Sequence, residues 1–263
     1  MDNYTEWMRE RTSWRTYQRK ELEKNDRERI MDFIDAPQFS PFGNKPRFKL
    51  IDNADMDEKI GTYGFIRGAQ NFIVGAAKRA PMSMEDYGYV FEKLILYLTG
   101  LGLGTCWLGG SFTKNSVADA LNPGVDEIIP AISPVGYRGD RGLVGKAIRW
   151  GAGSRNRKPW SDLFFNESLD SSLSVGDAGR YIVGFEMVRI APSASNGQPW
   201  RLVLDGECVH FYHDEKEYSV FRQLDLGIAM SHFDLANKEQ GISGEWSNES
   251  IIDPRYVATW SMV

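Results

Sequence analysis

The sequence predicts an α+β fold made of two similar lobes, each with a mostly antiparallel sheet flanked by helices. One observation is that segments with helical spacing alternate with short apolar runs of strand length. Another is a weak internal repeat, because the stretches "APQFSPFGNKP" and "APSASNGQP" both begin with Ala-Pro, continue to Asn and Pro, and lead into an alternating strand. A chain of 263 residues is long enough for two small cores. We therefore expect two lobes, residues 1–160 and 161–263, packed about a pseudo-two-fold axis.

The first lobe opens with charged helices and continues into strands. Residues 4–35 carry Ile30, Phe33 and Ile34 at roughly helical spacing, which predicts two helices around the stretch "RTSWRTY". Prolines and glycines then mark residues 36–46 as a loop. In chain order, the elements expected after it are a strand over 47–52, a strand over 69–77, a helix from Tyr87 that ends in glycines, and a strand over 128–137.

The second lobe repeats this plan in a shorter form. Residues 138–158 are rich in glycine and basic residues and lack periodicity, so we expect a linker or a ligand-facing loop there. Asp205-Gly206 lies between two alternating runs and predicts a β-hairpin. The other elements expected in this lobe are a helix over 178–189, a loop over 191–200, a helix over 226–240 and a last strand over 255–263.

Composition narrows the class of protein. The net charge of −5 argues against nucleic acid as the main partner. No apolar run approaches the roughly 20 residues that span a bilayer, and the first residues are polar, so we expect neither a membrane segment nor a signal peptide. Cys106 and Cys208 lie far apart, and neither they nor the histidines His210, His213 and His232 have the spacing of a metal site. We therefore expect a cytoplasmic protein with no metal site.

The stretch "RTSWR" places Arg11, Ser13 and Arg15 on alternate residues. Alternate side chains of an extended segment point to one side, and two guanidinium groups with a hydroxyl suit a phosphate monoester. A second basic run, "RNRKPW", brings Arg157 and Lys158, which could close on the same anion. The alternative for each run is a solvated basic surface.

The glycine-rich stretch "GLGLGTCWLGG" occupies residues 100–110. Its glycines follow a helix, whereas a dinucleotide-binding fingerprint follows a strand. It offers a turn whose backbone N–H groups a flat ring can approach closely. Cys106 could be a nucleophile, but no histidine has supporting spacing as its base, so we expect a buried, inert thiol.

The loop "APSASNGQPW", residues 191–200, combines two prolines with small polar residues and an Asn-Gly turn. It leads directly into the predicted hairpin. A loop rich in donors and tied to a rigid hairpin is a suitable place to hold a polar planar ligand.

Together these motifs resemble those of the flavin-dependent nitroreductase family. The resemblance rests on Arg-x-Ser-x-Arg at 11–15, Gly-Leu-Gly-Thr-Cys-Trp-x-Gly at 102–109, the basic pair at 157–158 and the complete Ala-Pro-Ser-x-x-Asn-x-Gln-Pro-Trp loop at 191–200. It implies an FMN site in which the arginines and Ser13 bind the phosphate, backbone N–H groups near Leu108 and Gly109 face the flavin, and the late loop holds the ring. The residues that it assigns to the cofactor are Arg11, Ser13, Arg15, Thr105, Trp107, Leu108, Gly109, Arg157, Lys158, Pro192, Ser193, Ser195 and Asn196.

The distribution of these motifs departs from the family pattern. The resemblance implies a homodimer in which one subunit supplies the Arg-Ser-Arg motif and its partner supplies the loop. Here the loop at 36–46 lacks the Ser and the Gln-Pro-Trp, while the second lobe lacks Arg-x-Ser-x-Arg. The two lobes therefore add up to one intact composite site. This resembles a branch of the family in which a single chain folds as a pseudo-dimer, so we expect a monomer.

The resemblance implies an FMN-dependent oxidoreductase that uses NAD(P)H to reduce a nitroaromatic, a quinone or a related small-molecule acceptor. Hydride transfer belongs to the flavin, so no side chain is expected to be catalytic. The alternatives are a flavin-binding or storage protein without turnover and a pseudo-enzyme without flavin. A yellow colour of the purified protein separates the last from the other two, and NAD(P)H oxidation separates the enzyme from the binding protein.

Overall fold

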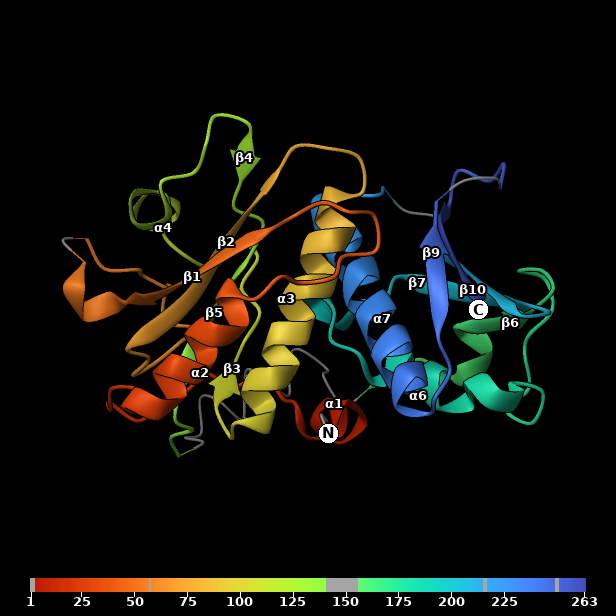
Figure 1. Ribbon diagram of the computed structural model, residues 1–263, viewed down its shortest axis with the longest axis horizontal. Helices are drawn as coiled ribbons and strands as arrows, with labels where there is room; N and C mark the ends of the chain where they lie inside the picture. The colour runs from red at the N-terminus through yellow and green to blue at the C-terminus, as the bar shows by residue number, and fades with distance from the viewer. Residues whose placement is uncertain (1–2, 57, 141–155, 215–216, 249–250) are drawn as a thin grey trace.

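The computed structural model describes residues 3–56, 58–140, 156–214, 217–248 and 251–263. Two sheets lie at opposite ends of the molecule, and two long helices, α3 (Ser83–Gly100) and α7 (Val220–Glu239), run side by side between them (Figure 1). This arrangement confirms the predicted α+β class with helices flanking two sheets. The N-terminus lies below the helix pair, where helix α1 (Tyr4–Glu10) contacts both long helices.

The first sheet has the strand order β1-β2-β5-β3, with β4 pairing to β2, and all of its pairs are antiparallel. Its strands are β1 (Arg47–Asp52), β2 (Asn71–Lys78), β3 (Gly104–Thr105), β4 (Glu127–Ile128) and β5 (Ile132–Gly136). The strands predicted over 47–52 and 69–77 are confirmed, and the single strand predicted over 128–137 is divided between β4 and β5. The two-residue strand β3 was not predicted, because so short a segment carries no alternation.

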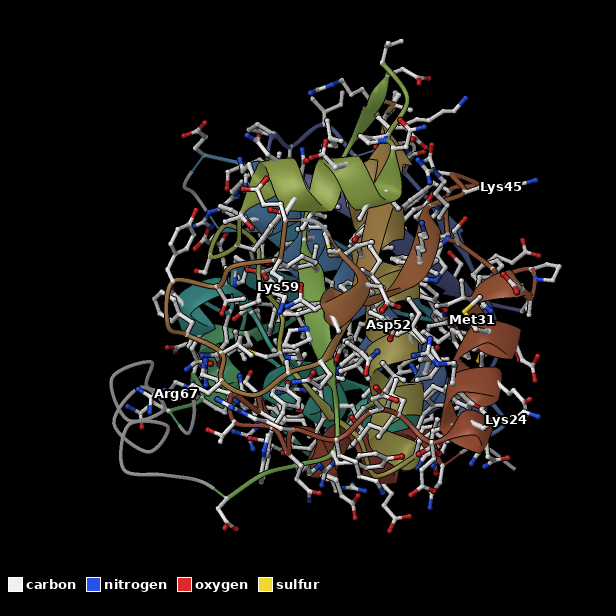
Figure 2. All side chains as sticks on the ribbon, turned by 90° about the vertical axis from the view of Figure 1, so that its left-hand side faces the viewer. Lys24, Met31, Lys45, Asp52, Lys59 and Arg67 are labelled. Carbon is white, nitrogen blue, oxygen red and sulfur yellow. The ribbon has the colours of Figure 1, made fainter. Side chains whose placement is uncertain are left out.

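Helices and one 3₁₀ turn surround the first sheet: α2 (Lys24–Asp35), η1 (Asn53–Asp55) and α4 (Lys114–Leu121). Helix α2 packs through the fully buried Ile30, and its Arg27 pairs with Asp52 at the end of β1. Figure 2 looks at this end of the molecule, where Lys24 and Lys45 project outward from the rim. Helix α4 was not predicted from the sequence.

The second sheet has the order β6-β7-β8-β10-β9, in which only the β6–β7 pair is parallel. Its strands are β6 (Phe164–Asn166), β7 (Trp200–Asp205), β8 (Cys208–His213), β9 (Gly244–Ser247) and β10 (Tyr256–Met262). The predicted hairpin at Asp205-Gly206 is confirmed, since it joins β7 to β8 and Gly206 has a φ of +59°. The remaining elements of this half are η2 (Trp160–Asp162), η3 (Gly179–Tyr181), α6 (Ile182–Ile190) and η4 (Ala194–Asn196).

Both long helices begin earlier than the sequence pattern indicates. Helix α3 starts at Ser83 rather than Tyr87, and α7 starts at Val220 rather than near residue 226. The first turn of α3 carries buried polar residues such as Glu85. Because charged residues are usually exposed, the sequence pattern did not indicate that this turn belongs to a buried helix. The loop expected over 138–158 lies largely outside the described residues. Among the described helices, none combines the length and apolar character needed to cross a membrane.

The helices α3 and α7 contact one another at two glycines, Gly88 and Gly227. A Cβ atom added to Gly88 would lie 2.3 Å from the carbonyl oxygen of Leu224, and one added to Gly227 would lie 2.0 Å from that of Glu85. Both distances are far shorter than any real contact, and the obstacle is backbone in each case. Glycine at these two positions therefore lets the helix backbones meet directly.

The two halves repeat one another around this contact. The pairs Gly88 and Gly227, Asp86 and Asp225, and Gly102 and Gly241 are each separated by 139 residues (227 less 88, 225 less 86, 241 less 102). Gly102 and Gly241 have φ values of +78° and +74° just beyond the two helix ends. The N–H groups that follow them donate back to Leu98 and Asn237, respectively. These matches support an internal duplication, and the division at residue 160 stays a prediction.

We expect Gly88→Ala to destabilise the protein by about 1–3 kcal/mol or more, because the added methyl group meets backbone that cannot move aside. Chemical denaturation of the variant measures the change in the free energy of unfolding. Gly176→Ala is the control, since a Cβ there would meet only Ser174 Oγ at 3.8 Å. Equal stability of the two variants would contradict a backbone-to-backbone contact at Gly88.

Candidate functional site

A cavity of about 520 Å³ opens between the two halves. It is lined by residues from the N-terminal segment, the glycine-rich turn, the loop at 192–196 and helix α7. The structure thus brings together motifs that lie up to about 180 positions apart in the chain. The predicted site residues on its wall are Arg11, Ser13, Arg15, Trp107, Leu108, Gly109, Arg157, Pro192, Ser193, Ser195 and Asn196.

The Arg-Ser-Arg motif is held in an extended conformation. Helix α1 ends at Arg11, where ψ is 128°. The segment then pairs with β3, because Trp14 N–H donates to the carbonyl oxygen of Thr105 at 2.7 Å. Arg67 N–H donates to the carbonyl oxygen of Arg15 at 2.9 Å from the other side. Pairing on both edges turns alternate side chains toward the cavity, as the motif predicts.

Thr105 and Lys158 are the two predicted site residues outside the cavity wall. Thr105 is buried and supports the motif from behind through its backbone pairing with Ser13. Lys158 donates from Nζ to the carbonyl oxygen of Gln198 at 3.1 Å, and its N–H donates to Gln198 Oε1 at 2.8 Å. Thr105 therefore supports the Arg-Ser-Arg segment and Lys158 contacts Gln198 of the second loop.

Arg157 fastens the loop from the second half. Its guanidinium donates to the carbonyl oxygens of Ile190 and Ala191 at 2.8 and 2.9 Å, and to Asn196 Oδ1 at 2.8 Å. Burial, followed by the nearby charges of Arg11 and Arg189, lowers the pKa of Arg157 to about 10. The end of this side chain is therefore buried beside other positively charged groups.

The amide of Asn196 is engaged by protein groups. Its Oδ1 accepts from Arg157, and its Nδ2 donates to the carbonyl oxygen of Asn156 at 2.8 Å. Ser195, Asn196 and Gln198 all have positive φ values, from 46° to 55°, which non-glycine residues adopt only when their surroundings hold them. The sequence predicted Asn196 as a partner of the ligand, and the structure shows it holding the loop in a strained shape beside the cavity.

The glycine-rich turn forms the opposite wall. Leu108 N–H donates to the carbonyl oxygen of Ile132 at 2.9 Å. This donor therefore does not face the cavity, although the resemblance implied that it would. Gly109, the next residue, lies against the ring of Phe221, and a Cβ there would come within 2.4 Å of that ring. Phe221 and Phe65 are both 44% exposed and line the cavity from opposite halves. They were not singled out from the sequence.

A polar network centred on the fully buried Glu92 and His232 lies behind this wall. Glu92 Oε2 accepts from Trp107 Nε1 at 2.7 Å, and its Oε1 lies 3.0 Å from His232 Nε2 and 3.8 Å from Arg11 Nε. His232 Nδ1 lies 2.9 Å from the carbonyl oxygen of Met187, which can only accept, so this nitrogen carries a proton. The network joins both long helices to two residues of the cavity wall. A charged residue inside the apolar run of α3 was the one sequence signal for it.

Asp225 was also missed by the sequence analysis. It lies on α7, lines the cavity and is 5% exposed. Both carboxyl oxygens approach the N–H of Ala194, at 3.0 and 3.1 Å. Burial raises the pKa of Asp225 to about 8, against the opposing effects of the Ala194 hydrogen bond and the charge of Arg222.

The sequence matches one protein-family model, described as "Putative TM nitroreductase", over residues 3–237. The chain belongs to this nitroreductase family. Its structure is similar to that of a "putative nitroreductase" from Thermotoga maritima, with 21% identity, a TM-score of 0.68 and coverage of 99% of this chain and 94% of that chain. This similarity confirms the nitroreductase-like fold.

Matches to other solved structures are partial. An FMN-dependent nitroreductase from Clostridium difficile has 20% identity and a TM-score of 0.41, and the match covers 51% of this chain and 87% of that chain. A nitroreductase with bound FMN from Bacteroides fragilis has 19% identity and a TM-score of 0.42, with coverage of 54% and 92%, respectively. A search of curated proteins finds no match.

The nitroreductase fold brings no metal-binding cluster together among the residues described here. His210 pairs with Thr259, His213 with the carbonyl oxygen of Pro254, and His232 with Glu92. Cys106 lines the cavity, but burial raises the pKa of its thiol. The raised pKa favours the neutral thiol over the reactive thiolate.

We expect the free energy of unfolding of the Asp225→Asn variant to increase relative to that of wild type as the pH rises. Because the pKa in the folded protein is raised to about 8, the folded state holds this proton more tightly than the unfolded state. Wild type therefore loses stability between the two pKa values, by at most about 1.4 kcal/mol per pH unit, and the variant does not. Urea denaturation from pH 5 to pH 9 measures the difference, which should grow with pH and level off above pH 8.

The exposed Asp119 supplies the matched control, since Asp119→Asn removes a carboxyl group from the surface of α4. A stability difference for Asp225→Asn that does not change with pH would show that Asp225 is not a buried titrating group.

Proposed function

We propose that this protein is an FMN-dependent oxidoreductase, which takes a hydride from NAD(P)H and delivers it to a nitroaromatic, a quinone or a related acceptor. The observation that carries the proposal is the cavity itself. It joins the extended Arg-Ser-Arg segment and the glycine-rich turn of one half to the rigid loop of the other half.

The charges on the cavity wall fit a phosphate group. Arg11, Arg15 and Arg157 line it together, whereas Asp225 is the one carboxyl group among the described lining residues. Burial, and after it the charges of Arg11 and Arg189, lowers the pKa of Arg157. A phosphate dianion would offset these positive charges and accept charge-assisted hydrogen bonds from guanidinium groups.

The rest of the cavity fits a flat ring system. Leu108, Pro192 and Ile228 provide apolar surface, and Gly109 presents bare backbone. A volume of about 520 Å³ lies within the range of cofactor sites. When bound, FMN supplies the hydride chemistry, and the protein binds it, orients it and excludes water.

The exposed rings of Phe65 and Phe221 support an aromatic second ligand. Planar nicotinamide and nitroaromatic or quinone rings stack favourably on phenylalanine, by about 0.5–1.5 kcal/mol beyond the area buried. Both rings line the cavity while remaining partly open to solvent. They are therefore suitably placed for a ligand that enters and leaves during turnover.

We further propose one composite site per chain, formed by duplicated lobes 1–160 and 161–263, in a cytoplasmic monomer. The loop at 36–46 supports this, because its Phe42 and Asn44 N–H groups bind Asp86 rather than facing an anion site. Phe42 also packs against the core of the second half, and Phe39 contacts the ring of Tyr89. The first loop is thus packed against Asp86 and the aromatic core, which supports a single site per chain.

The test of the proposed function is the absorbance spectrum of the purified protein, followed by NAD(P)H oxidation with a nitroaromatic or quinone acceptor. A flavin spectrum with turnover supports the oxidoreductase. Bound flavin without turnover indicates a binding protein instead, and a colourless protein that does not take up FMN contradicts both.

We expect Arg15→Ala to weaken FMN binding by roughly ten- to 150-fold, because a shielded charge-assisted pair contributes about 1.5–3 kcal/mol. Titration of the flavin-free protein by fluorescence quenching measures the dissociation constant. Arg19→Ala, an exposed arginine four positions later, is the matched control. Equal affinities of the two variants would mean that Arg15 does not contact the ligand.

The same titration of the wild-type protein should reach one FMN per chain, and Asn196→Ala should weaken binding while Asn44→Ala should not. Loss of the Asn196 amide releases Arg157 and the strained loop beside the cavity. Asn44 instead donates to Asp86 and to the carbonyl oxygen of Pro81. Two equivalents of FMN, or equal effects of the two variants, would contradict a single composite site.

A further inference from the structure

Asp225 and Asp86 occupy matching positions on the two long helices, but their hydrogen bonds differ. Asp86 accepts three hydrogen bonds from the loop of its own half: from Phe42 N–H at 3.0 Å, Asn44 N–H at 2.8 Å and Asn44 Nδ2 at 3.0 Å. Asp225 accepts from the Ala194 N–H alone among the described residues. The residue that could correspond to Asn44 in the second loop, Asn196, is turned toward Arg157.

This difference leaves Asp225 with unused hydrogen-bonding capacity in a buried position. A carboxylate has roughly four lone-pair sites, and a neutral carboxyl group has an O–H donor that needs an acceptor. Burying either without partners costs free energy, so a ligand in the cavity is expected to supply what the protein does not. Asp86, by contrast, is fully buried and does not line the cavity.

The charges around Asp225 come from several elements. On its own helix, Arg222 is paired with Asp214. The other titratable residues that line the cavity are Arg11, Arg15, Cys106 and Arg157. Glu85 of helix α3 meets α7 through its backbone at Gly227. Glu85 is itself bound to the hydroxyl group of Tyr218 at 2.7 Å. None of the arginines makes a hydrogen bond to Asp225 among the described residues, and burial keeps the carboxyl group neutral near pH 7.

We propose that Asp225 is a catalytic acid, which donates a proton to the electron acceptor as that acceptor is reduced in the cavity. The inference rests on the proposed function, with NAD(P)H as the reductant acting through bound FMN. A quinone becomes a hydroquinone by gaining two electrons and two protons, and the hydride delivers both electrons with one proton. The second proton comes from Asp225: its O–H bond breaks, an O–H bond forms on the quinone oxygen, and the carboxylate is reprotonated by water.

The test compares wild type with Asp225→Asn, which keeps an oxygen for the Ala194 N–H but has no acidic proton. In the flavin-free protein, the infrared carbonyl band of a neutral carboxyl group should disappear as the pH rises through about 8, and the variant should lack it. In stopped-flow experiments on the reduced holoprotein at pH 7, the variant should reduce 1,4-benzoquinone about 100-fold more slowly. Its reduction of ferricyanide, which accepts an electron without a proton, should be unchanged.

The pH dependence of the rate and a control variant provide two further tests of the acid role. The benzoquinone rate of wild type should fall as the pH rises through about 8, and that of the variant should not. Asp86→Asn is the matched control, with wild-type rates toward both acceptors. An equal loss with both acceptors, or the absence of the infrared band, would overturn the acid role and leave the proposed function standing. Failure of the wild-type protein to bind FMN would instead overturn the proposed function, and the acid role with it.

Discussion

The direct contact between helices α3 and α7 is the constraint on which the rest of the structure depends. Gly88 and Gly227 allow the two backbones to approach so closely that a single methyl group on either would collide with the other helix. Close packing of this kind fixes the relative position of the two helices, because neither backbone can yield. The α3 residues Tyr89 and Val90 consequently belong to the same core as Phe185 and Phe233 of the second half.

The cavity follows from that contact. Since α3 and α7 lie side by side, the turn that follows α3 comes to face the loop that precedes β7, and both meet the segment that follows α1. The buried Glu92 and His232 connect the helix pair to the cavity wall through Trp107 and Arg11. A displacement of the helices would therefore move residues in both walls of the cavity.

The two halves differ around matching positions of the two long helices. The same Asp-x-Gly sequence occurs at 86–88 and at 225–227, yet the first carboxyl group is satisfied by its own loop and the second faces a cavity. The difference originates in the loops: Phe42 and Asn44 turn inward in the first, whereas the second is held open by Arg157. The loop of one half thus binds a buried carboxyl group, and the loop of the other half lines the cavity.

The sequence by itself determined the α+β class, the principal strands and the set of motifs that meet at the cavity. These depend on periodicity, turn residues and short motifs, which are local properties. Only the tertiary structure decided that Leu108 N–H donates to β5, that Asn196 binds Arg157, and that Asp225 lines the cavity. Glu92 and His232, 140 positions apart, form a buried pair that no local pattern contains. The physical reason is that the burial and pairing of a polar group depend on which distant segments pack against it. Here the contact between α3 and α7 at Gly88 and Gly227 determines that packing.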